Sequence, residues 1–408
     1  MNPSRHKMTV LAQICKLIPG HMVNKLAAKH GVEEQARTFS PWSHVVSLLF
    51  TQTSHAMGLN DVCDTLQNHK GVLTTIRRAT APSRNGLSNA NRTRKPEMAE
   101  DLFWEMLKHL EGISEGFGMA RKYCSLPKRF RKTISTMDSS TIKLFANCLD
   151  WAKHRRRKAA AKMHLRLNLQ EFLPKMIIVK TAGTHDSAEA KELCADVKAG
   201  EIVVFDKAYI DYKHLYSMNT RGIFWVSRSK TNMKYKSVGQ HKGSMGKIIR
   251  DEIIELTCPN VGKKYPEKLR LVEAWVKIEG KEKRMTFITN NFEWAASSVS
   301  DLYKARWGIE VFFKELKQTL QLADFLGYNE NAVKWQVWTA LLVYLLLRFI
   351  AFQSKWGHSF FRLFTVLRGV LWSCLDMFSV LESYGTAGAV VRLRAVPEQG
   401  YLPGFAPI

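Results

Sequence analysis

The sequence predicts a mixed α+β fold in which an all-α N-terminal region precedes a core of short strands and helices. Residues 1 to about 112 consist of helical segments, short strands begin at Thr133, and strand-like composition returns from about residue 229 to 291. Because 408 residues are too many for one ordinary domain, we expect two or three units. These are a helical N-terminal domain (1–118), a core of strands and helices (119–355, with a β-rich insertion at about 229–291), and a C-terminal helical region and tail (356–408).

Four helices are expected in the N-terminal region, at residues 10–17, 41–57, 60–69 and 96–110. Ser40 stands at an N-cap position and Pro41 in the first turn of the second helix. The polar stretch 83–96 is predicted to be a loop. Its basic residues are Arg84, Arg92, Arg94 and Lys95. Short polar side chains beside arginines suit phosphate contact, and an ordinary solvated linker explains the same composition equally well.

The core is predicted from the order of its elements. Strands are expected at 134–138, 163–169 and 176–181, then a helix at 187–197, a strand at 201–205, a helix at 211–218 and a strand at 223–226. The alternation in MHLRLNL (163–169) predicts a half-buried strand, and apolar 201–205 predicts one buried on both faces. Three strands, helix, strand, helix, strand is the order of a ribonuclease-H-like core. In such a core Asp138 and Asp206 lie on neighbouring central strands, at one edge of the sheet.

Strands at 252–256, 271–278 and 284–289 are expected in the insertion, with YKSVGQHKGSMGK (235–247) as a glycine-broken loop. Trp275 lies in the second of these strands, where packing is the expected role and stacking on an unpaired base the alternative. Long helices should follow at 295–322, 331–352 and 360–375, with a frayed tail from Gly385. The most apolar run, 340–347, is too short to span a bilayer and predicts a buried core helix.

The charge balance predicts a polyanionic partner. Lys and Arg number 61 against 36 Asp and Glu, a formal net charge of +25. Nucleic acid is the first candidate and an acidic membrane surface the second, although no long basic amphipathic helix favours the membrane. Two basic runs, 121–132 and KHRRRK (153–158), are predicted to be a linker and a hairpin tip that touch DNA. The seven cysteines form no CxxC or Cys/His cluster, which indicates a reducing cytoplasm and argues against zinc.

One stretch, YKARWGIEVFFKELK (303–317), carries the most specific pattern. On a helix its polar residues lie along one face: Tyr303, Arg306, Glu310, Lys314 and Lys317. An apolar stripe on another face anchors the helix to a core: Leu302, Ile309, Phe313, Leu316 and Leu320. Alone, this would be an ordinary salt-bridged surface. Together with Asp138 and Asp206, Glu310 completes a set of three carboxylates. Such a set can bind two Mg²⁺ or Mn²⁺ ions, which suits in-line phosphoryl transfer.

The same stretch resembles the Tyr-x2-Arg-x3-Glu-x6-Lys signature of DDE transposases of the bacterial insertion-sequence-four family, with Tyr303, Arg306, Glu310 and Lys317 at its positions. MDSSTIKL (137–144) resembles the family's first-aspartate strand, VVFDKAY (203–209) its second-aspartate motif, and FITNN (287–291) the segment leading into the last helix. The helical N-terminal region resembles the domain before the core in one branch. One departure is Ala208, which stands where the family usually has glycine and is small enough to cause little damage.

The resemblance implies that Asp138, Asp206 and Glu310 bind the metal, that Tyr303, Arg306 and Lys317 hold phosphates at the element's end, and that Lys314 assists. It implies a cytoplasmic, nucleoid-associated enzyme that excises a DNA element and joins it to target DNA, through hairpin ends and as a dimer. Two alternatives remain open. One is a ribonuclease-H-like nuclease without strand transfer, and the other is a DNA-binding protein that has lost catalysis.

Overall fold

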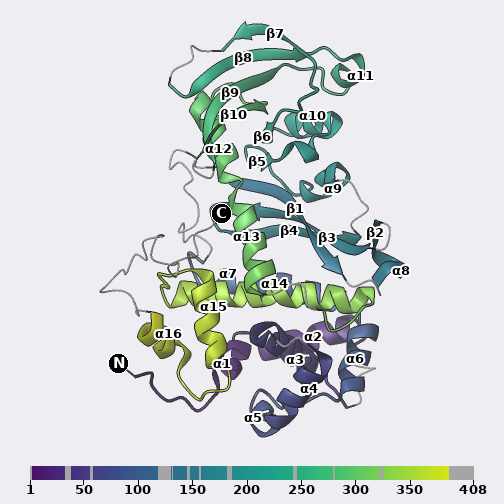
Figure 1. The fold of residues 1–408 in the computed structure, drawn as a ribbon, viewed down its shortest axis with the longest axis vertical. Coiled ribbons are helices and arrows are strands. Elements are labelled where there is room, and N and C mark those ends of the chain that lie inside the picture. The colour runs from purple at the N-terminus through teal and green to yellow at the C-terminus, as the bar shows by residue number, and fades with distance from the viewer. Residues whose placement is uncertain are drawn as a thin grey trace, which may run out of the picture.

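The computed structural model describes residues 2–32, 38–55, 58–117, 130, 132–144, 148–155, 158–181, 186–241, 246–278, 281–320 and 325–385. The molecule is elongated (Figure 1). The N-terminal and C-terminal helices form one end, a large mixed sheet lies in the middle, and a set of antiparallel strands forms the other end. The mixed α+β class is therefore confirmed. The basic run 121–132 and the tail after Gly385 lie almost wholly outside the described residues.

The N-terminal region is helical, as predicted. Its helices are α1 (Val10–Lys16), α2 (Gly20–Lys29), α3 (Pro41–Ser54), α4 (Leu59–Asn68), α5 (Lys70–Thr74), α6 (Arg84–Thr93) and α7 (Glu97–Ile113). The Ser40 side chain accepts a hydrogen bond from the Ser43 amide, so the predicted N-cap of α3 is confirmed. Helix α2 was missed because Pro19 and Gly20 suggest a break, yet the helix begins at that glycine.

The prediction of a loop at 83–96 was wrong, because α6 occupies most of it. Ser83 caps this helix by accepting a hydrogen bond from the Gly86 amide. Leu87, Ala90 and Asn91 are buried. Burial of Leu87 and Ala90 anchors the helix to the bundle, although most of its residues are polar. Arg94 is also buried, at 4% exposure, and donates to the carbonyls of the segment before α3. Arg94 is therefore a structural residue, and its predicted contact with phosphate is wrong.

Among the described residues, ten strands form one sheet with the order β2-β3-β1-β5-β6-β10-β9-β8-β7, and β4 pairs with β3. The core strands are β1 (Ile134–Leu144), β2 (Lys153–Arg155), β3 (Lys158–Asn168), β4 (Leu173–Thr181), β5 (Ile202–Phe205) and β6 (Phe224–Arg228). Helices α9 (Asp186–Leu193) and α10 (Tyr212–Thr220) follow β4 and β5. The predicted order of elements is confirmed, with β2 as an extra short strand.

Strand directions place the two aspartates together. The β1, β3 and β4 strands are antiparallel, whereas β1, β5 and β6 run parallel. Met137 pairs with Phe205 in the β1–β5 register, so Asp138 and Asp206 each follow one member of a cross-strand pair. Their predicted positions on neighbouring strands are confirmed. Strand β5 is buried at all four positions, also as predicted.

Strand β3 is buried on both faces, so the prediction of a half-buried strand was wrong. Its apolar residues face the core shared with the helices, and its polar residues His164, Arg166 and Asn168 are at most 3% exposed. Helix α9 packs over this strand, and Arg166 pairs with Asp196 just after that helix. The polar side chains of β3 thus take their partners from inside the protein, with Arg166 paired to Asp196 and His164 close to the Tyr209 hydroxyl.

The β-rich insertion extends the same sheet instead of forming a separate one. It comprises β7 (Tyr235–Gln240), β8 (Ile248–Leu256), α11 (Pro259–Gly262), β9 (Leu269–Ile278) and β10 (Lys281–Thr289), and β10 pairs with the core strand β6. Strand β7 was predicted to be a loop. The sequence pattern does not predict this strand, because its residues are polar and exposed and include Gly239. Strand β7 forms by pairing with β8 along one edge.

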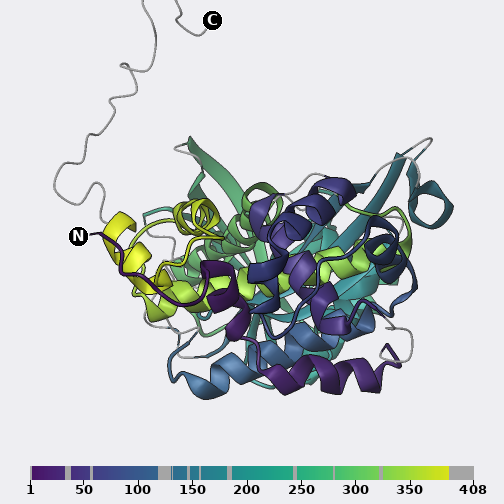
Figure 2. The same ribbon diagram turned by 90° about the horizontal axis from the view of Figure 1, so that it is seen from below.

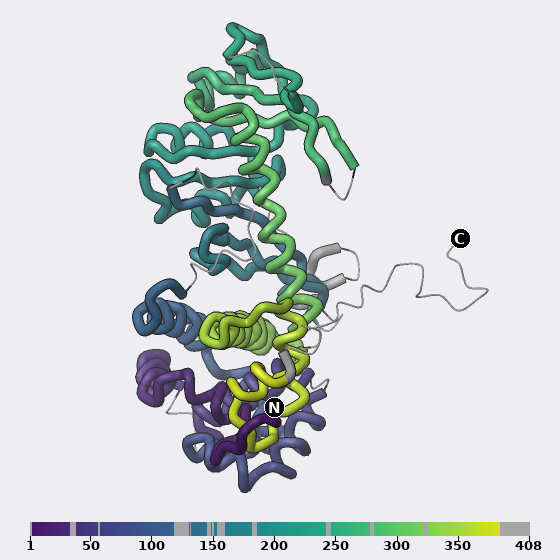
Figure 3. The backbone as a smooth tube through the Cα atoms, turned by 90° about the vertical axis from the view of Figure 1, so that its left-hand side faces the viewer, coloured from purple at the N-terminus to yellow at the C-terminus, as the bar shows by residue number. Residues whose placement is uncertain are grey.

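Helix α14 (Glu330–Gln353) crosses the molecule between the N-terminal helices and the sheet (Figures 1 and 3). It contains 24 residues, so the expectation that this region is too short to span a bilayer was wrong. Among the described helices it is long and apolar enough to do so, but 83% of its most apolar window is buried inside the protein. The prediction of a buried core helix is therefore confirmed. Helices α15 (Phe360–Gly369) and α16 (Met377–Gly385) follow, and one hydrophobic cluster joins them to α14 and the N-terminal helices.

Candidate active site

The three predicted carboxylates come from three different elements. Asp138 lies within β1, Asp206 follows β5 as the residue before the 3-10 helix η3 (Lys207–Tyr209), and Glu310 lies in α13 (Gly308–Lys314). Their side chains are 23%, 28% and 39% exposed. An ion from solvent can therefore reach all three carboxylates. Ala208 is exposed in the turn after Asp206 and does not have a positive φ, so this backbone requires no glycine there.

Arg306 joins two of the carboxylates. Its Nη1 donates to Asp138 Oδ2 at 2.7 Å and its Nη2 to Glu310 Oε1 at 2.8 Å. The Ser139 amide donates to the other oxygen of Asp138 at 2.8 Å. Burial raises the pKa of Asp138, and the Glu310 and Asp206 charges add to the rise, while Arg306 and the Ser139 amide oppose it. The acids therefore lie close enough to repel one another, and a cation between them offsets that repulsion.

Asp206 is held by two other groups. The Tyr303 hydroxyl donates to Asp206 Oδ1 at 3.0 Å, and an Arg228 guanidinium nitrogen lies 3.5 Å from the same oxygen. Tyr303 is 6% exposed and its ring packs on Phe287 of β10, with centroids 4.9 Å apart. Burial raises the pKa of Tyr303 to about 12, so its hydroxyl remains a proton donor at neutral pH. Arg228 was not predicted. It ends β6, and only the folded sheet places it beside β5.

The helix predicted at 295–322 is divided. It consists of α12 (Ala296–Ala305), α13 and a π-helical turn, η4 (Glu315–Thr319), which follow one another along one side of the sheet (Figure 3). Between α12 and α13 the amides of Arg306, Trp307, Ile309 and Glu310 donate to carbonyls three residues back. This overwound turn keeps the chain helical and leaves Arg306 and Glu310 in contact. The apolar stripe is confirmed, since Leu302, Ile309, Phe313, Leu316 and Leu320 are all buried.

The two lysines lie farther along this helical segment. Lys317 Nζ donates to the Thr141 carbonyl of β1 at 2.5 Å, and burial, then the nearby Lys143, lowers its pKa. Lys314 is exposed. The structure therefore brings Tyr303, Arg306 and the three carboxylates into direct contact, places Lys317 against β1 beyond them, and leaves Lys314 at the surface.

The chemical type of these ligands suits a divalent cation. Three carboxylates supply only oxygen ligands, which hard cations such as Mg²⁺ and Mn²⁺ prefer. However, no group of three or more His, Cys, Asp or Glu side chains within the described residues is already spaced to hold a metal. The Arg306 guanidinium lies between Asp138 and Glu310 and pairs with both carboxylates. A metal bound by both would have to take the place of this guanidinium.

A second layer of polar residues lies behind Asp138 and was not predicted. The Ser139 hydroxyl donates to Asp186 Oδ1 at 2.7 Å, and Lys162 Nζ lies 2.8 Å from the same oxygen. Buried His164, which pairs with Ser139 across β1 and β3, lies 3.5 Å from it. Asp186 begins α9, where an acidic residue is common for reasons of helix polarity alone. The sequence therefore contained no signal for this contact.

Tyr209 extends this layer from the second-aspartate motif. Its hydroxyl lies 3.4 Å from His164 Nδ1, and the residue is 1% exposed. Burial raises the pKa of Tyr209, and the Asp186 charge raises it further. Since Tyr209 follows Asp206 by three residues, the motif DKAY both presents Asp206 to solvent and anchors the turn beneath it.

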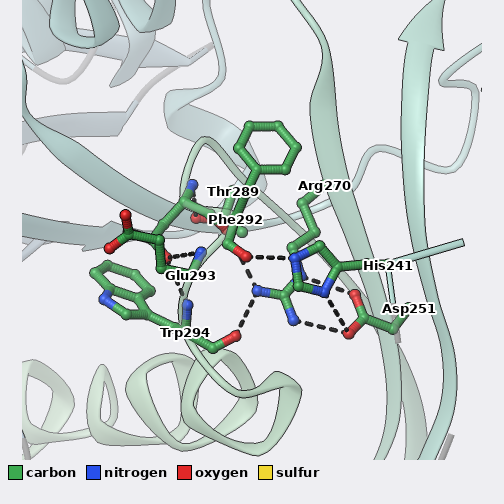
Figure 4. A network of polar contacts seen from close by, with 8 residues as sticks. His241, Asp251, Arg270, Thr289, Phe292, Glu293 and Trp294 are labelled. Atoms are coloured by element: carbon green, nitrogen blue, oxygen red, sulfur yellow. Dashed lines mark hydrogen bonds and ion pairs between the residues drawn. The ribbon is translucent and has the colours of Figure 1, made fainter. Parts of the chain in front are cut away.

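A buried ion pair fixes the insertion to the start of α12 (Figure 4). Arg270 of β9 is fully buried and donates twice to Asp251 of β8, at 2.7 Å in each case. The same guanidinium donates to the Trp294 carbonyl at 2.6 Å, and His241 contacts both Asp251 and the Phe292 carbonyl. This network holds the segment that leads into α12, the helix carrying Tyr303.

The FITNN segment has a structural explanation. Asn290 accepts a hydrogen bond from the Trp225 amide and donates to the Ile223 carbonyl, so it joins the end of β10 to β6. Asn291 accepts from the amides of Glu293 and Trp294 and shapes the turn before α12.

Three carboxylates from distant parts of the sequence and one arginine thus lie together at one edge of a mixed α/β sheet. The chain belongs to the family described as "Transposase DDE domain", which matches residues 129–346, more than half of its length. Residues 6–76 match a second family, described as "Domain of unknown function (DUF4372)". The resemblance stated from sequence motifs is therefore confirmed at the level of the family.

Named relatives agree with this assignment. The chain is 28% identical over 230 residues to a Geobacillus stearothermophilus protein named "Probable transposase for insertion sequence element IS5377" (56% of this chain, 59% of the relative). It is 30% identical over 226 residues to the Sinorhizobium fredii protein y4zB, which also carries a transposase name (54% of this chain, 62% of the relative). It is 25% identical over 197 residues to "Transposase InsG for insertion sequence element IS4" of Escherichia coli (46% of this chain, 43% of the relative).

The match spans about three fifths of the length of the first two relatives. Among solved structures, a piggyBac transposase synaptic complex with hairpin DNA, determined by cryo-electron microscopy, is similar with a TM-score of 0.41 and 11% identity. That similarity covers 94% of this chain and 84% of that one.

Proposed function

We propose that this protein is a DNA transposase that cleaves the ends of an insertion sequence in a metal-dependent reaction and joins them to target DNA. One observation carries the proposal. Asp138, Asp206 and Glu310 come from distant parts of the sequence, and Arg306 and Tyr303 link them in one partly exposed site. Membership of the transposase DDE domain family supports the same activity.

The strand order supports a ribonuclease-H-like core. The sequence β4-β3-β1-β5-β6, with β3 antiparallel to β1 and with β5 and β6 parallel to it, is the arrangement that this fold requires. We place the domain boundaries at 1–118, 119–355 and 356–408, with the insertion at about 229–291. Helix α14 belongs to the core by sequence and packs on α3, α6 and α7 of the N-terminal domain, so these domains would move as one body.

In this proposal Asp138, Asp206 and Glu310 would hold two Mg²⁺ or Mn²⁺ ions, which would supply activation of the attacking oxygen and stabilisation of the leaving oxygen. The chain's own residues prepare the site. Tyr303 orients the Asp206 carboxylate by donating to it, and the Ser139 amide orients Asp138. Arg306, once it leaves its carboxylates, can neutralise a phosphate of the DNA, as can Lys317 and the exposed Lys314.

The net charge of +25 supports DNA as the partner. We propose that element ends and target DNA bind in turn, that a homodimer holds two ends, and that excision passes through hairpin ends. We place the protein in the bacterial cytoplasm, associated with the nucleoid.

The test is a cleavage reaction on a labelled duplex that contains the terminal sequence of the source element, with Mg²⁺ or with EDTA. The matched variant is Glu310→Gln, and Glu330→Gln serves as a control on an exposed glutamate. A metal-dependent nick at the element's end followed by a hairpin or joined product, absent only in Glu310→Gln, is the expected result. Nicks without joining would indicate a nuclease, and binding without cleavage in Mg²⁺ would contradict the proposal.

A further inference from the structure

Helix α6 presents an unusual surface at the edge of the N-terminal helices (Figures 1 and 2). Its buried side consists of Leu87, Ala90 and Asn91. On a helix of 3.6 residues per turn, the exposed residues form one continuous arc of about half the circumference. Those residues are Arg84, Asn85, Ser88, Asn89, Arg92 and Thr93.

The chemistry of this arc differs from that of an ordinary solvated helix. Basic residues on solvated faces usually pair with acidic ones, as Lys25 and Lys29 of α2 do with Glu105 and Asp101 of α7. Residues 84–93 contain no Asp or Glu. Arg84 and Arg92 form no ion pair with any described residue, and Arg92 instead donates to Asn89 at 3.1 Å.

The helix is also held rigidly. Asn91 on its buried side bonds to His44 Nε2 at 2.8 Å, and the Trp335 indole of α14 donates to the Arg94 carbonyl just after the helix at 3.0 Å. Asn331, at the start of α14, donates to the Arg92 carbonyl at 2.9 Å. A ten-residue helix fixed in this way presents its polar arc without a large cost in conformational entropy on binding.

The edge of the sheet at β2 lies on the same side of the molecule. The Trp151 indole, just before β2, donates to the Tyr328 carbonyl at 2.8 Å, two residues before the start of α14. Strand β2 therefore lies beside the same end of α14 that holds α6. A duplex that contacts α6 would extend toward this edge of the sheet.

We propose that α6 enters the major groove of duplex DNA and reads base edges. Guanidinium groups pair with guanine and carboxamide groups with adenine in that groove, and an α-helix fits its width. Arg84, Asn85, Asn89 and Arg92 provide these two kinds of group, and Ser88 provides a small hydroxyl between them. The inference rests on the proposed transposase function, because it assigns recognition of the element's end to this helix.

The test is selection from a library of randomised DNA duplexes by the full-length protein in EDTA, so that binding is measured without cleavage. The double variant Asn85→Ala/Asn89→Ala removes two base-reading amides from the surface. Asn24→Ala, an exposed asparagine of α2, is the matched control. We expect wild type and the control to enrich one motif. The double variant should lose about ten-fold or more in discrimination at one or two positions and retain its affinity for unselected duplex.

Arg84→Ala/Arg92→Ala supplies an independent readout, since it should also reduce the salt dependence of binding. If the Asn85/Asn89 variant enriches the wild-type motif with unchanged discrimination, α6 does not read bases and the inference is overturned. Enrichment of no motif by wild type would overturn it as well. Neither result affects the proposed catalytic function, because metal-dependent cleavage and its loss in Glu310→Gln are measured separately.

Discussion

The Arg306 guanidinium lies between Asp138 and Glu310 and donates to both, at 2.7 and 2.8 Å. It is 11% exposed at the side chain. A single positive charge thus occupies the position that a metal shared by these two carboxylates would need. In the proposed function, Arg306 would therefore stabilise the metal-free site and compete with a metal for it.

Replacing Arg306 by Gln tests this competition. Asp138 and Glu310 would lose their shared cation, so we expect the free energy of unfolding without metal to fall by about 2 kcal/mol. Added Mn²⁺ should raise the midpoint of thermal unfolding more in Arg306→Gln than in wild type, since no guanidinium has to leave. Lys314→Gln, an exposed lysine of the same helix, is the control. Equal Mn²⁺ responses in wild type and Arg306→Gln would refute the competition.

Asp186→Ala should destabilise the protein by about 2 kcal/mol, because Lys162, Ser139 and buried His164 all lose their shared acceptor. Chemical denaturation measures this change. Glu192→Ala removes an exposed carboxylate that pairs with Lys180 at the surface, and it should cost about 0.5 kcal/mol or less. If both variants had the same small effect, the layer behind Asp138 would have no structural importance.

Asp251→Ala should be among the most damaging substitutions in the insertion. Arg270 would remain fully buried without its carboxylate, which costs about 3–5 kcal/mol. Glu252→Ala, at the next position, breaks a pair with the part-exposed Arg250 and should cost about 1 kcal/mol or less. Denaturant unfolding of both variants distinguishes the two roles. If Asp251→Ala lost no more free energy of unfolding than Glu252→Ala, the structural role of the buried network in Figure 4 would be contradicted.

Stability should depend on pH through Glu315, in the π-helical turn after α13. Burial raises the pKa of Glu315 to about 7, and Arg348 of α14 opposes the rise. Because the folded pKa exceeds the unfolded one, this group's contribution is fully present below the unfolded pKa and is lost as pH rises through about 7. Glu315→Gln should remove this dependence and stabilise the protein on the order of 2 kcal/mol at pH 8. An identical pH profile of unfolding in wild type and Glu315→Gln would contradict the assignment.

Much of the fold could be predicted because local patterns and tertiary environment agree. The apolar segment 202–205 becomes the buried strand β5, and Ser40 caps α3. The spacing of Tyr303, Arg306 and Glu310 also predicts their contact, even though the helix is overwound between the last two.

The errors arose where tertiary contacts supply what the sequence pattern lacks. Helix α6 was predicted to be a loop because its polar residues outnumber its apolar ones. Burial of Leu87 and Ala90 against the bundle stabilises the helix. Strand β7 forms only because β8 lies beside it. The contacts of Arg228 with Asp206, and of Asp186 with Ser139, depend on which strands and helices become neighbours, which no single segment specifies.

The central claim, that three carboxylates form one divalent metal site, is tested most directly by iron-directed backbone cleavage. Fe²⁺ replaces Mg²⁺ in the protein, ascorbate and peroxide are added, and the cut positions are mapped. We predict cuts near Asp138, Asp206 and Glu310 that excess Mg²⁺ suppresses and that the Asp138→Asn/Asp206→Asn/Glu310→Gln variant lacks. Cuts confined to other segments, or cuts that persist unchanged in the triple variant, would contradict the account.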